Sequence, residues 1–263
     1  MTSALKPPAG TLPSKARIRQ SFERAAPTYD SAASVQRKIC QQLIGRLSPD
    51  LAPASVLDAG CGTGYALDLL QHRFPAATML ALDLSSAMLQ RISAPCSRLV
   101  GDLDHLPLAA ASIDLYWSSL AVQWCDLVKV VHEAHRVLRP NGQLAIASLG
   151  PNTFHELRLA FADIDDYRHT LGFHSPAEIG AMAQAAGFTA VDVQKSTEIA
   201  HYPDFKTLLR AVKAIGANQI GEGKRTSLMP RRAFNYAETA FEKLRTTAGL
   251  PLTYDVITLT ART

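Results

Sequence analysis

The chain has 263 residues, a formal net charge of +4, 47% hydrophobic residues and 19% charged residues. This composition is too apolar for a disordered chain and too evenly mixed for a fibrous one, so we expect one folded domain with an elaboration. No run of about 18 apolar residues occurs, which argues against a transmembrane helix. Residues 1–15 lack the apolar stretch of a signal peptide, so we expect a cytoplasmic protein.

The charges are unevenly distributed along the chain. Residues 1–50 have a balance of +5, residues 51–199 a balance of −6, and residues 200–245 again +5. Ordinary solvation of helix surfaces is one explanation. The other is a negatively charged partner that meets the two basic flanks.

The cysteines and histidines do not predict a metal site. Cys40, Cys61, Cys96 and Cys125 form no C-x-x-C pair and have no metal-ligand spacing, so reduced thiols are expected. His132 and His135 flank Glu133 without the spacing of the H-E-x-x-H motif.

The first half of the chain predicts helices and then a regular alternation of strands and helices. Residues 16–47 have a helical pattern that Pro27 should interrupt. Five short apolar strands follow, at 55–58, 79–83, 99–102, 113–117 and 143–149. Helices are expected between them, at 67–74, 85–92 and 126–138. This alternation predicts a parallel sheet that helices cover on both faces.

The rhythm changes after residue 150. We expect a helix at 175–186 and strands at 190–199 and 252–261, with helices at 205–215 and 231–247 between the two strands. The predicted organisation is a flexible tail (1–15), N-terminal helices (16–50), a Rossmann-like domain (51–199), a helical lid insertion (200–250) and a final strand (251–263). The expected fold is an α/β fold with a mostly parallel, seven-stranded sheet.

The most informative stretch is 56–64, VLDAGCGTG, at the end of the first strand. Alternate glycines let the backbone turn sharply and approach a ligand closely. The spacing is not the G-x-G-x-x-G of dinucleotide-binding folds, and no G-K-[ST] follows. A carboxylate at Asp58 would repel a pyrophosphate but would suit a ligand that carries an ammonium or sulfonium charge.

Two further acids stand where the second and third predicted strands end. Asp83 is placed to accept both hydrogen bonds of a ribose diol. Asp102 precedes Leu103, and together they suit an adenine amine and ring. Each acid alone is more often a solvated loop residue or a helix cap than a ligand-binding residue. Three such acids at one edge of an open α/β sheet favour S-adenosylmethionine over NAD.

On these residues, the stretch 56–149 resembles the class I S-adenosylmethionine-dependent methyltransferases. Residues 58–64 match the first motif of that superfamily, Asp83 its ribose acid and residues 101–103 its adenine site. Residues 104–108 and 136–142 resemble its later landmarks. The resemblance implies a Rossmann-like class I methyltransferase fold, and it says nothing about the acceptor.

The flanks carry a narrower resemblance. The segments 21–30, 35–37, 119–125, 209–218 and 251–254 are similar to those of the malonyl-acyl carrier protein O-methyltransferases of biotin synthesis. This family methylates the free carboxyl of a malonyl thioester. The resemblance therefore implies S-adenosyl-L-methionine as cofactor, S-adenosyl-L-homocysteine as product, an acyl carrier protein as partner and no nucleic acid. We expect a monomer.

The reaction implied needs alignment more than acid–base chemistry. A carboxylate is ionised near pH 7, so no general base is required. A bidentate arginine is the natural clamp for it. Arg210 is the first candidate and Lys213 the second, although both also suit the solvated face of a lid helix. Tyr29 is a candidate for contact with the carboxylate or with the methionine end of the cofactor.

The resemblance also assigns the cofactor contacts. Gln36 is a candidate for the methionine carboxylate, and Met88 for the adenosine, with core packing as the alternative for Met88. Trp124 is expected to shape the pocket wall rather than to take part in chemistry. The full set of expected cofactor residues is Tyr29, Gln36, Asp58, Ala59, Gly60, Gly62, Gly64, Asp83, Leu84, Met88, Asp102 and Leu103.

Acyl carrier proteins of this kind are acidic, so basic residues of the predicted lid are candidates for docking. They are Lys206, Lys224, Arg225, Arg231 and Arg232. Other readings stay open: methylation of another small carboxylic acid or a quinone precursor, or a non-catalytic assembly factor. Nucleic-acid methylation ranks last, because no base-flipping motif such as N-P-P-Y is present.

Overall fold

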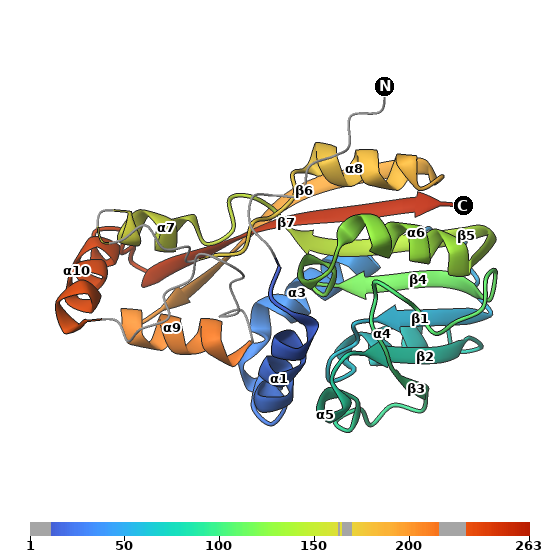
Figure 1. Ribbon diagram of the computed structural model, residues 1–263, viewed down its shortest axis with the longest axis horizontal. Coiled ribbons are helices and arrows are strands. Elements are labelled where there is room, and N and C mark those ends of the chain that lie inside the picture. Colours follow the sequence, from blue (N-terminus) through green and yellow to red (C-terminus); the bar gives the residue numbers. More distant parts are fainter. Residues whose placement is uncertain (1–11, 163, 165–169, 216–229) are drawn as a thin grey trace.

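The computed structural model describes residues 12–162, 164, 170–215 and 230–263. Its centre is a seven-stranded sheet with the order β3-β2-β1-β4-β5-β7-β6 (Figure 1). Strands β1 to β5 are parallel, and β7 lies antiparallel between β5 and β6. The strands are β1 (Ser55–Ala59), β2 (Thr78–Asp83), β3 (Ser97–Val100), β4 (Ile113–Ser119), β5 (Leu138–Leu149), β6 (Thr189–Tyr202) and β7 (Leu250–Arg262).

Helices cover both faces of this sheet, as the sequence predicts. The N-terminal helices are α1 (Lys15–Ala25), α2 (Tyr29–Ala32) and α3 (Ser34–Ile44). The helices between and after the parallel strands are α4 (Tyr65–Arg73), α5 (Ser86–Leu89), η1 (Val122–Trp124), α6 (Leu127–Val137), α7 (His155–Phe161) and α8 (Pro176–Ala185). Two more, α9 (Phe205–Ala214) and α10 (Arg231–Glu242), stand between β6 and β7.

The alternation of side chains along β4 shows how the two layers are built. Leu115 and Trp117 pack with α3 and α4 in one core cluster, and Tyr116 packs with α6 and α8 in the other. All three side chains are fully buried. A strand with both faces covered reads as a continuous apolar run, which is why β4 is recognisable from sequence.

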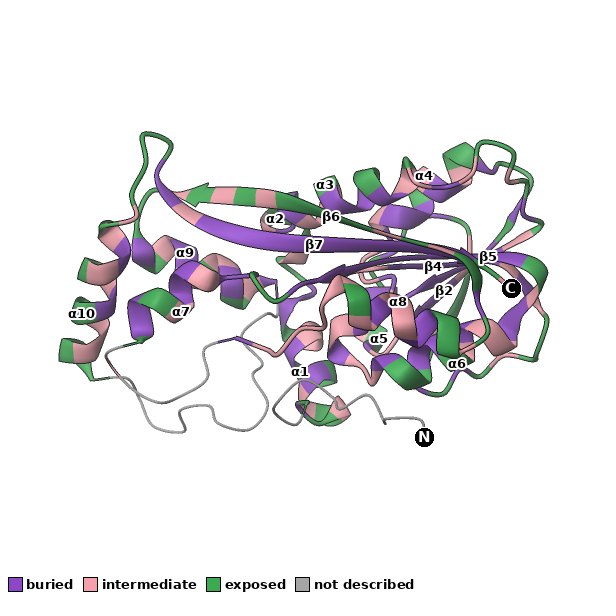
Figure 2. Ribbon diagram, turned by 90° about the horizontal axis from the view of Figure 1, so that it is seen from above, coloured by how far each residue is buried: buried purple, intermediate pink, exposed green. Residues whose placement is uncertain are grey.

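Strands β6 and β7 extend beyond the rest of the sheet, and α9 and α10 lie between them in the chain. The pairing of β5 with β7 ends at Val256, whereas β6 continues to pair with β7 as far as Leu250. Helices α7, α9 and α10 gather at this far end of the hairpin (Figure 2). The buried rings of Phe205 and Phe241, 5.2 Å apart between centroids, pack there as part of the core cluster that also contains Trp117.

Helices α9 and α10 confirm the predicted helical insertion before the last strand, and several details differ. Strand β5 begins at Leu138, where the predicted helix 126–138 ends, rather than at residue 143, and α10 ends at Glu242 rather than at residue 247. Helix α7, which contacts α10, was not predicted. Helix α5 is a single turn, shorter than the predicted 85–92. Residue Lys15, the last residue of the predicted tail, is the first residue of α1. None of the helices in the described ranges is long and apolar enough to cross a membrane.

Candidate functional site

A cavity of about 960 Å³, open to solvent, lies over the carboxyl ends of β1, β2 and β3. Open α/β sheets bind ligands at this edge. Its lining includes every predicted cofactor residue except Ala59 and Gly64: Tyr29, Gln36, Asp58, Gly60, Gly62, Asp83, Leu84, Met88, Asp102 and Leu103. Ala59 is fully buried in β1, and Gly64 is the residue that precedes α4. The predicted cofactor residues thus lie in one place.

The glycine loop shapes the floor of this cavity. Gly60, Gly62 and Gly64 have φ of +78°, +53° and +89°, a region that side-chain-bearing residues rarely adopt. A Cβ on Gly60 would lie 2.2 Å from the Cβ of Ala121, whereas a Cβ on Gly62 would meet nothing within 4 Å. Gly60 therefore allows close packing against the loop after β4, and Gly62 faces open space.

Asp83 is held in place by backbone amides at the end of β2. Its Oδ2 accepts a hydrogen bond from the Gly62 amide at 2.9 Å, and its Oδ1 accepts one from the Ser85 amide at 2.8 Å. Burial raises the pKa of Asp83, and these amide hydrogen bonds oppose that rise. The carboxylate is therefore oriented in advance, as a ribose-diol acceptor needs to be.

Asp58 is the most unusual group in the cavity. Its side chain is 1% exposed, and its Oδ2 has no hydrogen-bond partner among the described residues. Burial, with the charge of Asp83 as a second cause, raises its pKa to about 8. A buried acceptor of this kind is costly unless it is paired. The site therefore fits a ligand that brings a positive charge, and it disfavours a phosphate.

The third acid contacts a residue that the sequence reading missed. Lys15 Nζ lies 2.7 Å from Asp102 Oδ1 and 3.0 Å from Asp104 Oδ2, so α1 is tied to the loop after β3. Leu103 and Met88, both buried, line the same part of the cavity. Lys15 gave no signal in the sequence because the contact joins residues 87 positions apart.

A second, smaller pocket of about 540 Å³ adjoins the first. Phe22, Tyr29, Gln36, Leu120 and Trp124 line both. The second pocket also takes Gln123, Leu149, Phe154, Thr170, Leu171, Phe173, Ile215 and Tyr254. Its described lining has hydroxyl and amide groups and no charged side chain.

Two phenol groups of this second pocket are kept neutral. Burial is the main cause that raises the pKa of Tyr29, and the charges of Asp83 and Asp30 add to it. Burial likewise raises the pKa of Tyr254, whose hydroxyl is hydrogen-bonded to Tyr202 and Gln36. Tyr29 is therefore available as a hydrogen-bond donor at neutral pH, whereas the hydroxyl of Tyr254 is already engaged with Tyr202 and Gln36.

The structure does not support the predicted carboxylate clamp. Arg210 and Lys213 are exposed on α9 and line neither pocket. The reason is the helix face: Phe205, Leu208 and Val212 are the buried residues of α9, so the two cations point away from them. Of α9 and the residue that follows it, Ile215 is the one that reaches the second pocket.

The remaining predictions for basic residues concern the lid surface. Lys206, Arg231 and Arg232 are exposed on α9 and α10. Lys224 and Arg225 lie outside the described residues.

Comparisons with known proteins match this geometry. Residues 57–146 match the family model described as a methyltransferase domain. The chain is 71% identical over 262 residues to a malonyl-acyl-carrier protein O-methyltransferase of Dechloromonas aromatica, with 100% of both chains covered. The chain belongs to the malonyl-acyl-carrier protein O-methyltransferase family. A family member from Laribacter hongkongensis is 42% identical over 92% of this chain and 87% of its own.

Other matches show the same domain in different contexts. A biotin biosynthesis bifunctional protein, BioHC, of Cellvibrio japonicus is 35% identical over 92% of this chain and 49% of its own length. Among solved structures, the YcgJ protein of Bacillus subtilis superposes with a TM-score of 0.59 at 18% identity, covering 85% of this chain and 97% of that chain. A methyltransferase from Thermotoga maritima gives 0.57 at 18% identity, with 93% and 99% covered. These structures establish the class I methyltransferase fold.

The state of Asp58 predicts that S-adenosylmethionine binding releases a proton. At pH 7 a carboxyl with a pKa of about 8 is mostly protonated, and a cationic ligand lowers that pKa. Calorimetry at pH 7 in two buffers of different ionisation enthalpy should therefore report close to one proton released. The affinity should rise by up to about tenfold per pH unit and level off above pH 8.

The matched control is Asp58→Asn, which keeps the shape and removes the titration. It should bind more weakly and release no proton. Equal proton release from the wild type and from this variant would contradict the assignment of Asp58.

Proposed function

We propose that this chain transfers a methyl group from S-adenosylmethionine to the free carboxyl of a malonyl thioester on acyl carrier protein, as a step of biotin synthesis. The observation that carries the proposal is the 71% identity over the whole chain, which extends far beyond the 57–146 methyltransferase domain. The aligned region includes α9, α10 and Ile215, whose side chain reaches the second pocket.

The two adjoining pockets fit a two-substrate reaction. The larger one fits the cofactor, because it carries the carboxyls of Asp58, Asp83 and Asp102. The smaller one fits the acceptor, because its lining is apolar and neutral polar. Tyr29 lines both pockets, so it stands where the donor and the acceptor meet.

The acceptor carboxylate needs orientation without neutralisation. When bound, S-adenosylmethionine supplies a methyl group on a cationic sulfur, and an ionised carboxylate accepts it without help from a base. A cation that paired with the carboxylate would lower its nucleophilicity. Tyr29 and the amides of Gln36 and Gln123 are neutral donors that can orient it while leaving its charge intact.

Aromatic side chains restrict access of water to this junction. The rings of Phe22 and Trp124 meet edge to face at 5.7 Å, and Phe22 also meets Tyr29 at 6.5 Å. Phe22 belongs to α1, so the N-terminal helix forms one wall of the reaction centre. Alignment inside such an enclosure can supply roughly 7–11 kcal/mol of the barrier.

In the proposed reaction, the exposed cations of α9 bind the acidic carrier protein. Lys206, Arg210 and Lys213 follow one another at intervals of four and three residues, so they share one face of the helix. The residue after the same helix, Ile215, lines the acceptor pocket. An acidic carrier protein on this face would lie beside the pocket that its thioester must enter.

The proposed activity is tested by product analysis. The protein is incubated with labelled S-adenosylmethionine and malonyl carrier protein, and the carrier is analysed by mass spectrometry for a methyl ester. Asp83→Ala, which removes the ribose acceptor, should bind no S-adenosylmethionine and form no ester. A labelled product on another small acid, with unmodified malonyl carrier protein, would contradict the proposal.

Tyr29→Phe separates the two roles predicted for that hydroxyl. If Tyr29 orients the acceptor, kcat should fall by about tenfold to a hundredfold, since loss of a hydrogen bond to a charged group costs ~1.5–3 kcal/mol. The affinity for S-adenosylhomocysteine should stay unchanged. Tyr65→Phe, which alters a hydroxyl in the cofactor cavity alone, is the control and should keep its kcat. Weaker S-adenosylhomocysteine binding by the Tyr29 variant would move its role to the cofactor.

Docking on α9 predicts a salt-dependent Michaelis constant for the carrier protein. Lys206→Glu, Arg210→Glu and Lys213→Glu should each raise KM for malonyl carrier protein severalfold at low ionic strength and less at high salt. Turnover of malonyl-pantetheine, which has no protein part, should not change. Lys129→Glu, an exposed cation on α6, is the control. A KM that ignores both salt and these substitutions would remove α9 as the docking face.

A further inference from the structure

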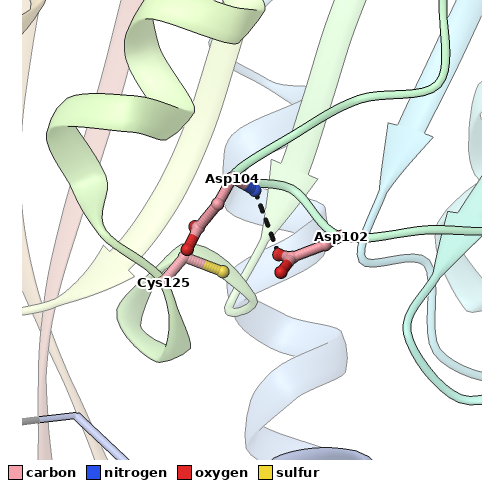
Figure 3. A group of neighbouring side chains, drawn as sticks. All are labelled: Asp102, Asp104 and Cys125. Atoms are coloured by element: carbon pink, nitrogen blue, oxygen red, sulfur yellow. Dashed lines mark hydrogen bonds between the residues drawn. The ribbon is translucent and has the colours of Figure 1, made fainter. Parts of the chain in front are cut away.

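Lys15 has an unusual position for the first residue of a surface helix. Its Nζ lies 2.7 Å from Asp102 Oδ1, 3.0 Å from Asp104 Oδ2 and 3.4 Å from Cys125 Sγ. Figure 3 shows how the three partners face one another from the loop after β3 and the segment before α6. Their ligand atoms all lie within 4.8 Å of one another. The Lys15 ammonium therefore supplies the positive charge that balances the two neighbouring carboxylates.

The surroundings keep Lys15 charged. Burial alone would lower the pKa of its ammonium, but the Cys125 thiol and the two carboxylates outweigh burial and raise it. The side chain is 32% exposed, so the ion pairs are partly shielded from solvent. Charge-assisted hydrogen bonds in such a place are short and directional.

The bonds around Asp102 fix one of its two oxygens. Oδ1 accepts hydrogen bonds from Lys15 Nζ and from the Asp104 amide at 3.0 Å. Oδ2 has no recorded hydrogen bond within the described part of the chain. Asp104 Oδ1 in turn accepts one from the Asp126 amide at 3.2 Å. Lys15 thus ties α1 to the loop and to the start of α6.

The cofactor cavity lies directly beside this network. Lys15, Asp102, Leu103 and Cys125 all line it, and Ile18 and Phe22 of the same helix line it too. A change in the Lys15 contact therefore affects both the direction of the Asp102 carboxylate and the closure of α1 over the cavity.

We propose that Lys15 is a positioning residue for the adenine subsite, which holds Oδ1 of Asp102 so that Oδ2 is free to accept the exocyclic amine of the base. This inference rests on the proposed cofactor. It adds a specificity determinant from the N-terminal helix, outside the cofactor motifs of the sheet.

The position of Lys15 predicts that the site discriminates between adenine and hypoxanthine. An adenine amine donates to a fixed carboxylate, whereas the 6-oxo group of hypoxanthine is repelled by it. Without Lys15 the Asp102 carboxylate loses its restraint, and its preference for a donor weakens. A helix that merely packs the cavity would affect both bases equally.

The test measures the dissociation constants of S-adenosylhomocysteine and S-inosylhomocysteine by calorimetry. Discrimination is the dissociation constant of S-inosylhomocysteine divided by that of S-adenosylhomocysteine. Lys15→Met should lower this ratio by about tenfold, and Lys15→Gln should also lower it. Lys15→Arg, which keeps the charge, should retain most of the discrimination. Arg19→Met, which removes an exposed cation of the same helix that pairs with Glu23, is the control and should keep the wild-type ratio.

A double variant connects the effect to Asp102. In the Asp102→Asn background, Lys15→Met should change the ratio no further. An unchanged ratio in both Lys15→Met and Lys15→Gln, with equal loss for both ligands, would overturn the inference. This test measures binding and not activity, so its failure is distinguishable from failure of the proposed function. If the protein preferred the adenosyl ligand but methylated another acceptor, the proposed substrate would be refuted and the role of Lys15 would not.

Discussion

The site depends on one electrostatic constraint: a carboxyl group near the end of β1 is buried, and one of its oxygens has no hydrogen-bond partner in the described part of the chain. Burial raises the pKa of Asp58 to about 8, so the carboxyl is mostly protonated at neutral pH until a positive charge arrives. The residues around Asp58 suit the same positively charged ligand. The glycine loop brings backbone close to the same space, and Asp83 is fixed by two amides at its rim. A cavity built in this way selects a cationic nucleoside ligand over a phosphate.

Acidic, neutral polar and basic side chains occupy different parts of the molecule. Carboxyl groups face the cofactor cavity, neutral phenols and amides face the adjoining pocket, and the cations of α9 are exposed to solvent. An anionic acceptor is therefore attracted to the protein from a distance but meets no described cation inside the pocket. In the proposed reaction, that arrangement keeps the acceptor carboxylate reactive while Tyr29 orients it. Lys15 and Arg37 are exceptions: both are cations that line the cofactor cavity, and each is paired with carboxylates, Lys15 with Asp102 and Asp104 and Arg37 with Asp30.

The sheet and the cofactor cavity were predictable from the sequence because their signals are local. A buried strand reads as a short apolar run, and a glycine turn followed by acids at successive strand ends needs no long-range information. The position of Lys15 depends on tertiary contact and has no local signal. The exposure of Arg210 was readable from the apolar spacing of Phe205, Leu208 and Val212, which places both cations on the opposite face. Helix α7 escaped prediction because it is seven residues long and begins after Phe154, at a φ of +57°.

The most direct test of the constraint on Asp58 is a carbon-13 NMR titration of its side-chain carboxyl, assigned with the Asp58→Asn variant. The account predicts a midpoint near pH 8 in the free protein and a midpoint well below 7 in the presence of saturating S-adenosylmethionine. A midpoint near the ordinary value of about 4 in the free protein, unchanged when the ligand binds, would contradict it.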